Sequence, residues 1–167
     1  SQVFLNTNMA ASGGVVAAIL ISLILTGKMD VTMAMNGAIA GLVAITASPS
    51  APTAGVAVLV GAAGGALVYF SILYFDKKLK LDDPVGAMSA HGIVGILGVM
   101  LVPLTSTSDA SYFYQFIGVV SIAGFTFITS LLTILAINKF MPIRATDEEQ
   151  YEGLDKSEIG VEAYPEF

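Results

Sequence analysis

Apolar residues run along this chain in five long stretches, separated by short polar breaks. The stretches cover approximately residues 3–25, 31–46, 54–74, 84–102 and 113–140. A helix needs roughly 20 apolar residues to cross the hydrocarbon core, so the second stretch is a little short and the fifth is long enough to tilt. Apart from terminal positions, none contains Lys, Arg, Asp or Glu. The pattern predicts an all-α membrane protein, a bundle of about five transmembrane helices.

Composition supports a bilayer rather than water as the solvent of this chain. Of its 167 residues, 55% are hydrophobic and 12% are charged, with a mean hydropathy of +0.80, whereas soluble domains carry about a quarter charged residues. The net charge of −6 comes from residues 147–167, which hold eight acids and one lysine. We therefore divide the chain into a transmembrane helical domain, residues 1–140, and an acidic tail, residues 141–167. No basic footprint for nucleic acid is present.

The basic residues predict the orientation of the helices. All seven lie in the first break, in the third break, or at or beyond the C-terminal end of the last stretch: Lys28, Lys77, Lys78, Lys80, Lys139, Arg144 and Lys156. With five spans these positions fall on one side, which the positive-inside rule assigns to the cytoplasm. The tail is therefore expected to be cytoplasmic. Because the chain lacks an initiator Met and begins almost directly with apolar sequence, we also expect it to be a piece of a longer protein.

Small residues predict close packing between the helices. Gly37 and Gly41 form a GxxxG pattern in the second stretch, and Gly61 and Gly65 form another in the third. Lipid gives no hydrophobic drive for helices to associate, so they approach through such small residues. We expect one compact bundle rather than separate helices.

The fourth stretch carries the strongest local signature. Asp83 followed by Pro84 predicts a helix start, because the carboxylate can accept from free backbone N–H groups and proline suits the first helical position. This structural role accounts for Asp83 without a functional one. The chain has no cysteine, and no catalytic triad, metal cluster, nucleotide-binding loop or other enzyme motif is visible. We predict neither catalysis nor a cofactor.

His91 is the only histidine and the only ionisable side chain well inside a predicted span. It lies seven residues past Pro84, about 10 Å along a helix, and Ala87 precedes it by one turn on the same face. Ionisable groups at membrane depth are costly and usually face a bundle interior or a water-accessible path. Two interpretations stay open: a residue of a transport path, or a neutral imidazole that bonds a neighbouring carbonyl and joins two helices.

An ordered set of motifs resembles the ammonium transporter, methylammonium permease and Rhesus family, and most closely its bacterial channels. The resemblance covers essentially the entire chain. Its residues are Asn36-Gly37-Ala38-Ile39-Ala40-Gly41-Leu42-Val43 with Thr46, Asp82-Asp83-Pro84, His91-Gly92-Ile93-Val94-Gly95, Glu152-Gly153-Leu154-Asp155 and Ala163-Tyr164.

The resemblance implies a fold and an assembly. Family members have eleven spans, built as two inverted five-helix repeats plus a long final helix, and form trimers with one pore per subunit. By this analogy the five stretches are the last five spans. The other pore residues would then lie mostly in the N-terminal half of the same transporter. His91 would be the second of two pore histidines.

The resemblance also implies a function, ammonium or ammonia transport across the plasma membrane, with methylammonium as an analogue. Ammonium would lose its proton at an outer site, and neutral ammonia would cross an apolar constriction lined by the two histidines. Ala87, Ile39 and Thr46 would lie on or near the path. An ammonium sensor and a non-transporting structural subunit are the alternatives.

The tail motif, Glu152-Gly153-Leu154-Asp155 together with Tyr164, resembles the family's cytoplasmic C-terminal region, which couples the subunits. In bacterial members a PII-type signalling protein can bind there. Ile159-Gly160 stands here in place of the family's usual His-Gly. The detail of such regulation is therefore less well supported than transport. An acidic, solvated tail without a partner is the alternative.

Overall fold

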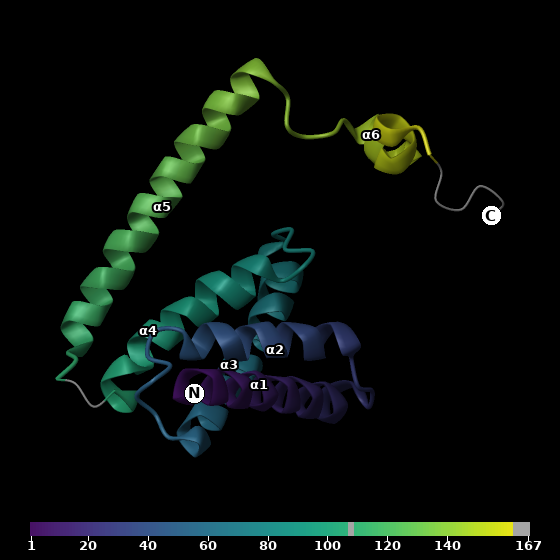
Figure 1. Ribbon diagram of the computed structural model, residues 1–167. Helices are drawn as coiled ribbons and strands as arrows, with labels where there is room; N and C mark the ends of the chain where they lie inside the picture. Colours follow the sequence, from purple (N-terminus) through teal and green to yellow (C-terminus); the bar gives the residue numbers. More distant parts are fainter. Residues whose placement is uncertain (107–108, 162–167) are drawn as a thin grey trace. The chain divides into compact units, whose positions relative to one another are not determined.

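The computed structural model describes residues 1–106 and 109–161 of the chain (Figure 1), and every regular element among them is helical. Five of the α-helices consist mainly of apolar residues: α1 (Gln2–Thr26), α2 (Val31–Ile45), α3 (Ala54–Tyr74), α4 (Val94–Thr105) and α5 (Tyr112–Phe140). A short helix, α6 (Asp147–Glu152), lies in the tail. Three π-helical segments complete the order: η1 (Phe75–Leu79) continues α3, η2 (Met88–Ile93) precedes α4, and η3 (Asp155–Ile159) follows α6.

The all-α membrane fold predicted from sequence is confirmed. Four helical stretches among the described residues are long and apolar enough to cross a membrane: Gln2–Thr26, Ala54–Leu79, Met88–Thr105 and Tyr112–Phe140. The remaining apolar helix, α2, has only 15 residues, about 22 Å at 1.5 Å per residue, against a hydrocarbon core of about 30 Å.

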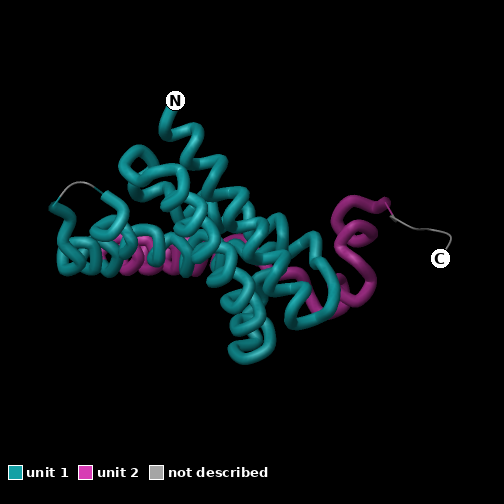
Figure 2. Tube along the Cα trace, turned by 90° about the horizontal axis from the view of Figure 1, so that it is seen from below, with its two compact units in different colours: residues 1–120 teal, residues 121–167 magenta. Residues whose placement is uncertain are grey.

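The chain forms two compact units, residues 1–120 and residues 121–167 (Figure 2). In the first unit α1 packs against both α2 and α3, which also pack against each other, and α4 with η2 lies against α2 and α3. The core consists of small and branched residues: Ala10, Ala40, Ala44, Ile45, Ala57, Val60, Val68, Ala90 and Val94. With so little side-chain volume in the core, the helix backbones approach closely.

The glycine motifs lie where backbones touch. A Cβ on Gly61 would overlap the carbonyl oxygen of Ala10, and one on Gly65 would overlap that of Gly14. Gly41 meets Ala10 in the same way from α2. Each contact involves main-chain atoms that cannot rotate aside, so these positions require glycine for helix association.

An asparagine joins the N-terminal part of α1 to the connection between α2 and α3. Asn6, which is fully buried, donates from Nδ2 to the carbonyl oxygens of Pro49 (2.9 Å) and Pro52 (2.7 Å). Thr53 then caps α3 by accepting from Val56 N–H. One side chain of α1 therefore fixes the α2–α3 connection, which holds the end of α2 in place.

The fourth predicted helix needs a correction at its start. It was expected to open at Pro84, but the helical segment begins at Met88 and runs on to Thr105. Gly86 donates to Asp83 O (3.0 Å) and has a φ of +69°, so Pro84 and Val85 belong to a turn. Asp at the first position, Pro at the second and Gly at the fourth are favoured in such a turn. The predicted start was therefore four residues too early.

The tail motif forms the joint between α6 and η3. Thr146 and Glu149 make a capping box at the start of α6, and hydrogen bonds from the Thr146 backbone N–H and hydroxyl lower the pKa of Glu149. Gly153, with a φ of +98°, ends α6, and Leu154 and Asp155 lead into η3. Glu152 is the last residue of α6, and Tyr164 lies outside the described residues.

Candidate functional site

His91 lies at the edge of a hollow between the ends of two helices. The hollow, about 390 Å³ in volume, is lined by Val43, Thr46, Ala47, His91, Gly95 and Val99. We call it the His91 hollow. Because α2 packs against η2 and α4, the C-terminal end of α2 faces the helix that carries the imidazole. Apart from His91 and the Thr46 hydroxyl, the side chains around it are apolar.

Helical spacing explains which residues face the hollow. His91, Gly95 and Val99 follow one another at intervals of four, so they lie along one face of η2 and α4. Gly95 keeps this face open, since a Cβ there would have only Val43 Cγ1 near it, at 3.8 Å. Gly98, on the packed face, would instead meet the carbonyl oxygen of Ala44 at 2.7 Å. The same helix is tight against α2 on one face and open around His91 on the other.

The segment around His91 is π-helical rather than α-helical. Single π turns within α-helices are uncommon and are frequent at functional sites. The wider turn changes which way the side chains of Met88–Ile93 point relative to α4. It places Ser89 and Ala90 in the interior and leaves His91 exposed.

His91 makes no hydrogen bond to any residue that the structure describes. One interpretation from sequence was an imidazole bonded to a neighbouring backbone carbonyl and joining two helices. Within the described chain that bond is not formed. Both ring nitrogens are therefore available to a group that enters the hollow.

Asp83 fixes the start of the π-helical segment. Its Oδ1 accepts from Met88 N–H (3.0 Å), and its Oδ2 accepts from Ser89 N–H (3.1 Å) and the Ser89 hydroxyl (3.0 Å). Partial burial raises the pKa of Asp83, but the hydrogen bonds from Met88, Ser89 and Ala87 outweigh it and hold that pKa below its ordinary value. The carboxylate anchors the turn on which His91 lies.

Replacing Asp83 with alanine should destabilise the protein by about 1 kcal/mol, the usual cost of losing a helix cap. Because the folded pKa is lowered, this contribution is complete above the ordinary carboxyl pKa and fades as pH falls through the folded value. The free energy of unfolding in mixed detergent micelles at neutral pH measures the effect. Asp82→Ala is the control, since this exposed neighbour caps nothing; equal losses in both variants would contradict the assignment.

Of the three other pore candidates from sequence, only Thr46 lines the His91 hollow, and Ala87 and Ile39 do not. Thr46 donates its hydroxyl proton to Leu42 O (2.7 Å). Ala87, one turn before His91, is exposed, and Ile39 is 40% exposed on α2. Val43 and Gly95 entered the sequence analysis only as parts of the family motifs, and Ala47 and Val99 did not enter it. The four-residue spacing of Gly95 and Val99 from His91 was the signal that could have assigned these two to the hollow.

No group of three or more His, Cys, Asp or Glu side chains that could hold a metal ion occurs in the described part of the chain. What the site offers is an apolar hollow with one imidazole and one hydroxyl. Such a lining suits a small neutral molecule that can form one or two hydrogen bonds.

The amino-acid sequence is similar to those of known ammonium transporters. A model of the Ammonium Transporter Family matches residues 1–164. An ammonium transporter of Bacillus subtilis (strain 168) is 34% identical over 96% of this chain and 43% of its own length. Ammonium transporter Amt1 of Haloferax mediterranei is 36% identical over 99% of this chain and 33% of its own.

Solved structures give the same match. A protein described as Sensor Amt Protein is 32% identical with a TM-score of 0.86, over 94% of this chain and 41% of that one. Candida albicans Mep2 is 25% identical with a TM-score of 0.79, over 89% of this chain and 37% of that one. The chain therefore spans less than half the length of the relatives it matches.

Proposed function

The chain belongs to the Ammonium Transporter Family, and from that premise we propose that it forms the C-terminal half of a pore that conducts ammonium as ammonia. The observation that carries the proposal is the His91 hollow, an apolar space with an imidazole whose hydrogen bonds are not used within the chain. The substrate would pass through this space. The alternative of a purely structural histidine has less support, because no described partner holds the ring.

The chemistry of the hollow favours neutral ammonia over the ammonium ion. A cation moved into an apolar, dry space loses its hydration at a large cost, whereas a neutral amine needs only its few hydrogen bonds replaced. The imidazole of His91 can both donate and accept such bonds. The imidazole of His91 can also accept and release a proton, so it can pass on the proton that ammonium leaves behind, and a net charge then crosses with each ammonia.

Several finer features follow as part of the same proposal. Thr46 would line the path beside His91, and Ala87 and Ile39 would lie further along it. The other wall would come from the N-terminal half of the same transporter, in keeping with transporter sites formed between inverted repeats. We expect a homotrimer in the plasma membrane, methylammonium as a transported analogue, and a cytoplasmic tail. A PII-type protein would bind at Glu152, Gly153, Leu154, Asp155 and Tyr164.

The test is uptake of labelled methylammonium by proteoliposomes that contain the full-length protein. At mildly acidic pH nearly all of this substrate is the cation, so leakage of the neutral amine through lipid is small. We expect saturable uptake, inhibited by ammonium, that is absent from liposomes without protein. Saturable binding without uptake would instead indicate a sensor. The absence of both binding and uptake would indicate a structural subunit.

A further inference from the structure

Asn36 is a buried polar residue of α2 with an unused hydrogen-bond acceptor. Only 6% of its surface is exposed. Its Nδ2 donates to Thr32 O, one turn earlier on the same helix (3.1 Å), whereas its Oδ1 is buried and accepts no hydrogen bond from any residue that the structure describes. Buried polar atoms are paired in the large majority of cases, so an unpaired one needs an explanation.

The unpaired oxygen faces Gly86, which ends the turn formed by residues 83–86. We call it the Gly86 turn. A Cβ placed on Gly86 would lie 2.6 Å from Asn36 Oδ1 and 2.9 Å from Ile72 Cδ1. The amide of Asn36 therefore occupies space that a side chain at position 86 would need. The two positions fit together as one residue with a side chain and one without.

Gly86 joins this turn to the helical segment that carries His91. Its N–H donates to Asp83 O (3.0 Å), and its carbonyl oxygen accepts from Ala90 N–H (2.8 Å); His91 is the next residue. A shift of Gly86 would therefore reach the imidazole through one hydrogen-bonded turn. The N-terminal end of a helix carries a partial positive charge, which favours the negative oxygen of the Asn36 amide beside it.

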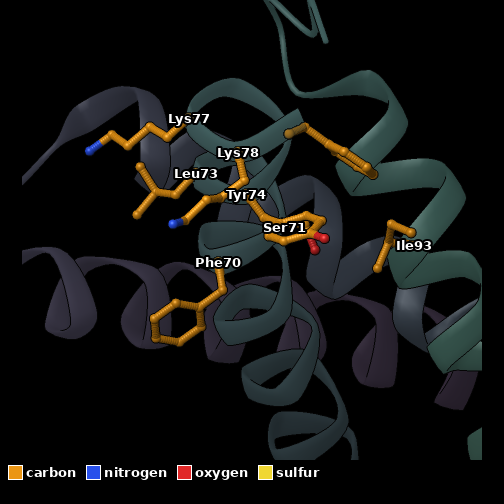
Figure 3. Close-up of a pocket in the computed structure, with 8 residues that line it drawn as sticks. Phe70, Ser71, Leu73, Tyr74, Lys77, Lys78 and Ile93 are labelled. Atoms are coloured by element: carbon orange, nitrogen blue, oxygen red, sulfur yellow. The ribbon is translucent and has the colours of Figure 1, made fainter. Parts of the chain in front are cut away.

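The other end of the π-helical segment is packed more loosely. Ile93 and the last turns of α3 line different sides of a hollow of about 650 Å³ (Figure 3). A Cβ on Gly92 would meet none of the described residues within 4 Å. The position of His91 therefore depends on the turn before it and on Ser89 and Ala90, which are buried.

We propose that Asn36 is a positioning residue for His91. Its amide fixes the Gly86 turn against α2 and thereby sets the position of the imidazole in the His91 hollow. The hydrogen bond to Thr32 holds the amide with its oxygen toward the turn. Asn36 itself does not line the hollow. The effect on transport rests on the function proposed above, whereas the position of the ring can be measured without substrate.

The first test is the NMR signal of the His91 ring in the full-length protein, labelled with ¹³C in its histidines and held in detergent micelles without ammonium. The His91 signal is the one that disappears in His91→Ala. We expect Asn36→Ala to shift this signal and to leave the other histidine signals in place. Asn36→Ser, whose side chain is too short to reach Gly86, should shift it in the same way.

The matched control is Asn8→Ala. Asn8 also donates to a carbonyl one turn earlier, Phe4 O (2.8 Å), but it is an exposed residue of α1. This variant should leave the His91 signal unchanged. An unchanged signal in both Asn36 variants, or an equal shift in Asn8→Ala, would overturn the proposal.

The second test is saturable methylammonium uptake by the same variants in proteoliposomes. Misplacing a group by about 1 Å can cost about 100-fold in rate, so the loss of one supporting side chain should lower uptake about 5- to 10-fold in Asn36→Ala. Added to His91→Ala, the same substitution should have no further effect, because Asn36 acts through the imidazole. Equal losses in both backgrounds would indicate a general structural role and would overturn the proposal. No uptake by the unmodified protein, with the His91 signal still shifted in Asn36→Ala, would refute the proposed function and support the positioning role.

Discussion

Gly61→Ala is expected to force α1 and α3 apart and to lower the free energy of unfolding by about 1–2 kcal/mol. The new Cβ would overlap the carbonyl oxygen of Ala10 and would lie 2.5 and 2.6 Å from its carbonyl carbon and Cα. These are main-chain atoms of a helix, so the strain cannot be relieved by a rotamer change. Overpacking costs about 1–3 kcal/mol, and a contact with backbone atoms this close belongs at the upper end of that range. Alanine gains roughly 1 kcal/mol over glycine within a helix, so the net loss is about 1–2 kcal/mol.

The control for this prediction lies on the same helix. A Cβ on Gly55 would meet nothing within 4 Å, so Gly55→Ala should leave stability unchanged or raise it slightly. Both variants are measured by unfolding in mixed detergent micelles. If Gly61→Ala were as stable as Gly55→Ala, the close approach of α1 and α3 would be wrong, and with it the packing that positions α2 beside His91.

His91→Ala is expected to reduce saturable methylammonium uptake about 10- to 100-fold while leaving the fold intact. The imidazole is exposed at the hollow and holds no described residue in place, so its removal costs little packing. A substrate in the apolar hollow would lose one hydrogen-bond partner. Removing a hydrogen-bond partner from a buried polar group costs about 1.5–3 kcal/mol, and this free energy corresponds to a roughly 10- to 100-fold lower rate. Gly55→Ala in the same assay controls for reconstitution, and unchanged uptake by His91→Ala would argue against the path.

The helices could be predicted from sequence because a bilayer requires long, uncharged segments. The structure places α1, α2, α3 and α5 within one residue of the limits expected from the apolar stretches. The GxxxG pairs, Gly37 with Gly41 and Gly61 with Gly65, also lie at helix contacts, since small residues are what lets helices approach in lipid.

The region before His91 could not be predicted as well, because two local signals compete there. A proline suits the first position of a helix, but Asp83-Pro84-Val85-Gly86 equally fits a turn. The structure has the turn, and the helix starts where the Asp83 carboxylate can still reach the backbone of Met88 and Ser89. The π-helical form of the next six residues has no sequence signature that we recognise.

Only part of the candidate site could be predicted from sequence, because most of its lining residues are brought together by helix packing. His91 stood out because an ionisable residue is rare at membrane depth, and Thr46 came from the family resemblance. Val43, Ala47, Gly95 and Val99 are ordinary membrane residues. They can be assigned to the hollow only once the packing of α2 against η2 and α4 is known.

The most direct test of the central claim is the ammonium-evoked current in proteoliposomes that contain the full-length protein, compared with the potassium-evoked current. Because the proton taken from ammonium crosses by way of the imidazole, we expect the unmodified protein to give a current with ammonium and little or none with potassium. His91→Ala should lose the ammonium current or its selectivity over potassium. A robust current with unchanged size and selectivity in His91→Ala would contradict the account and would leave His91 as a packing residue.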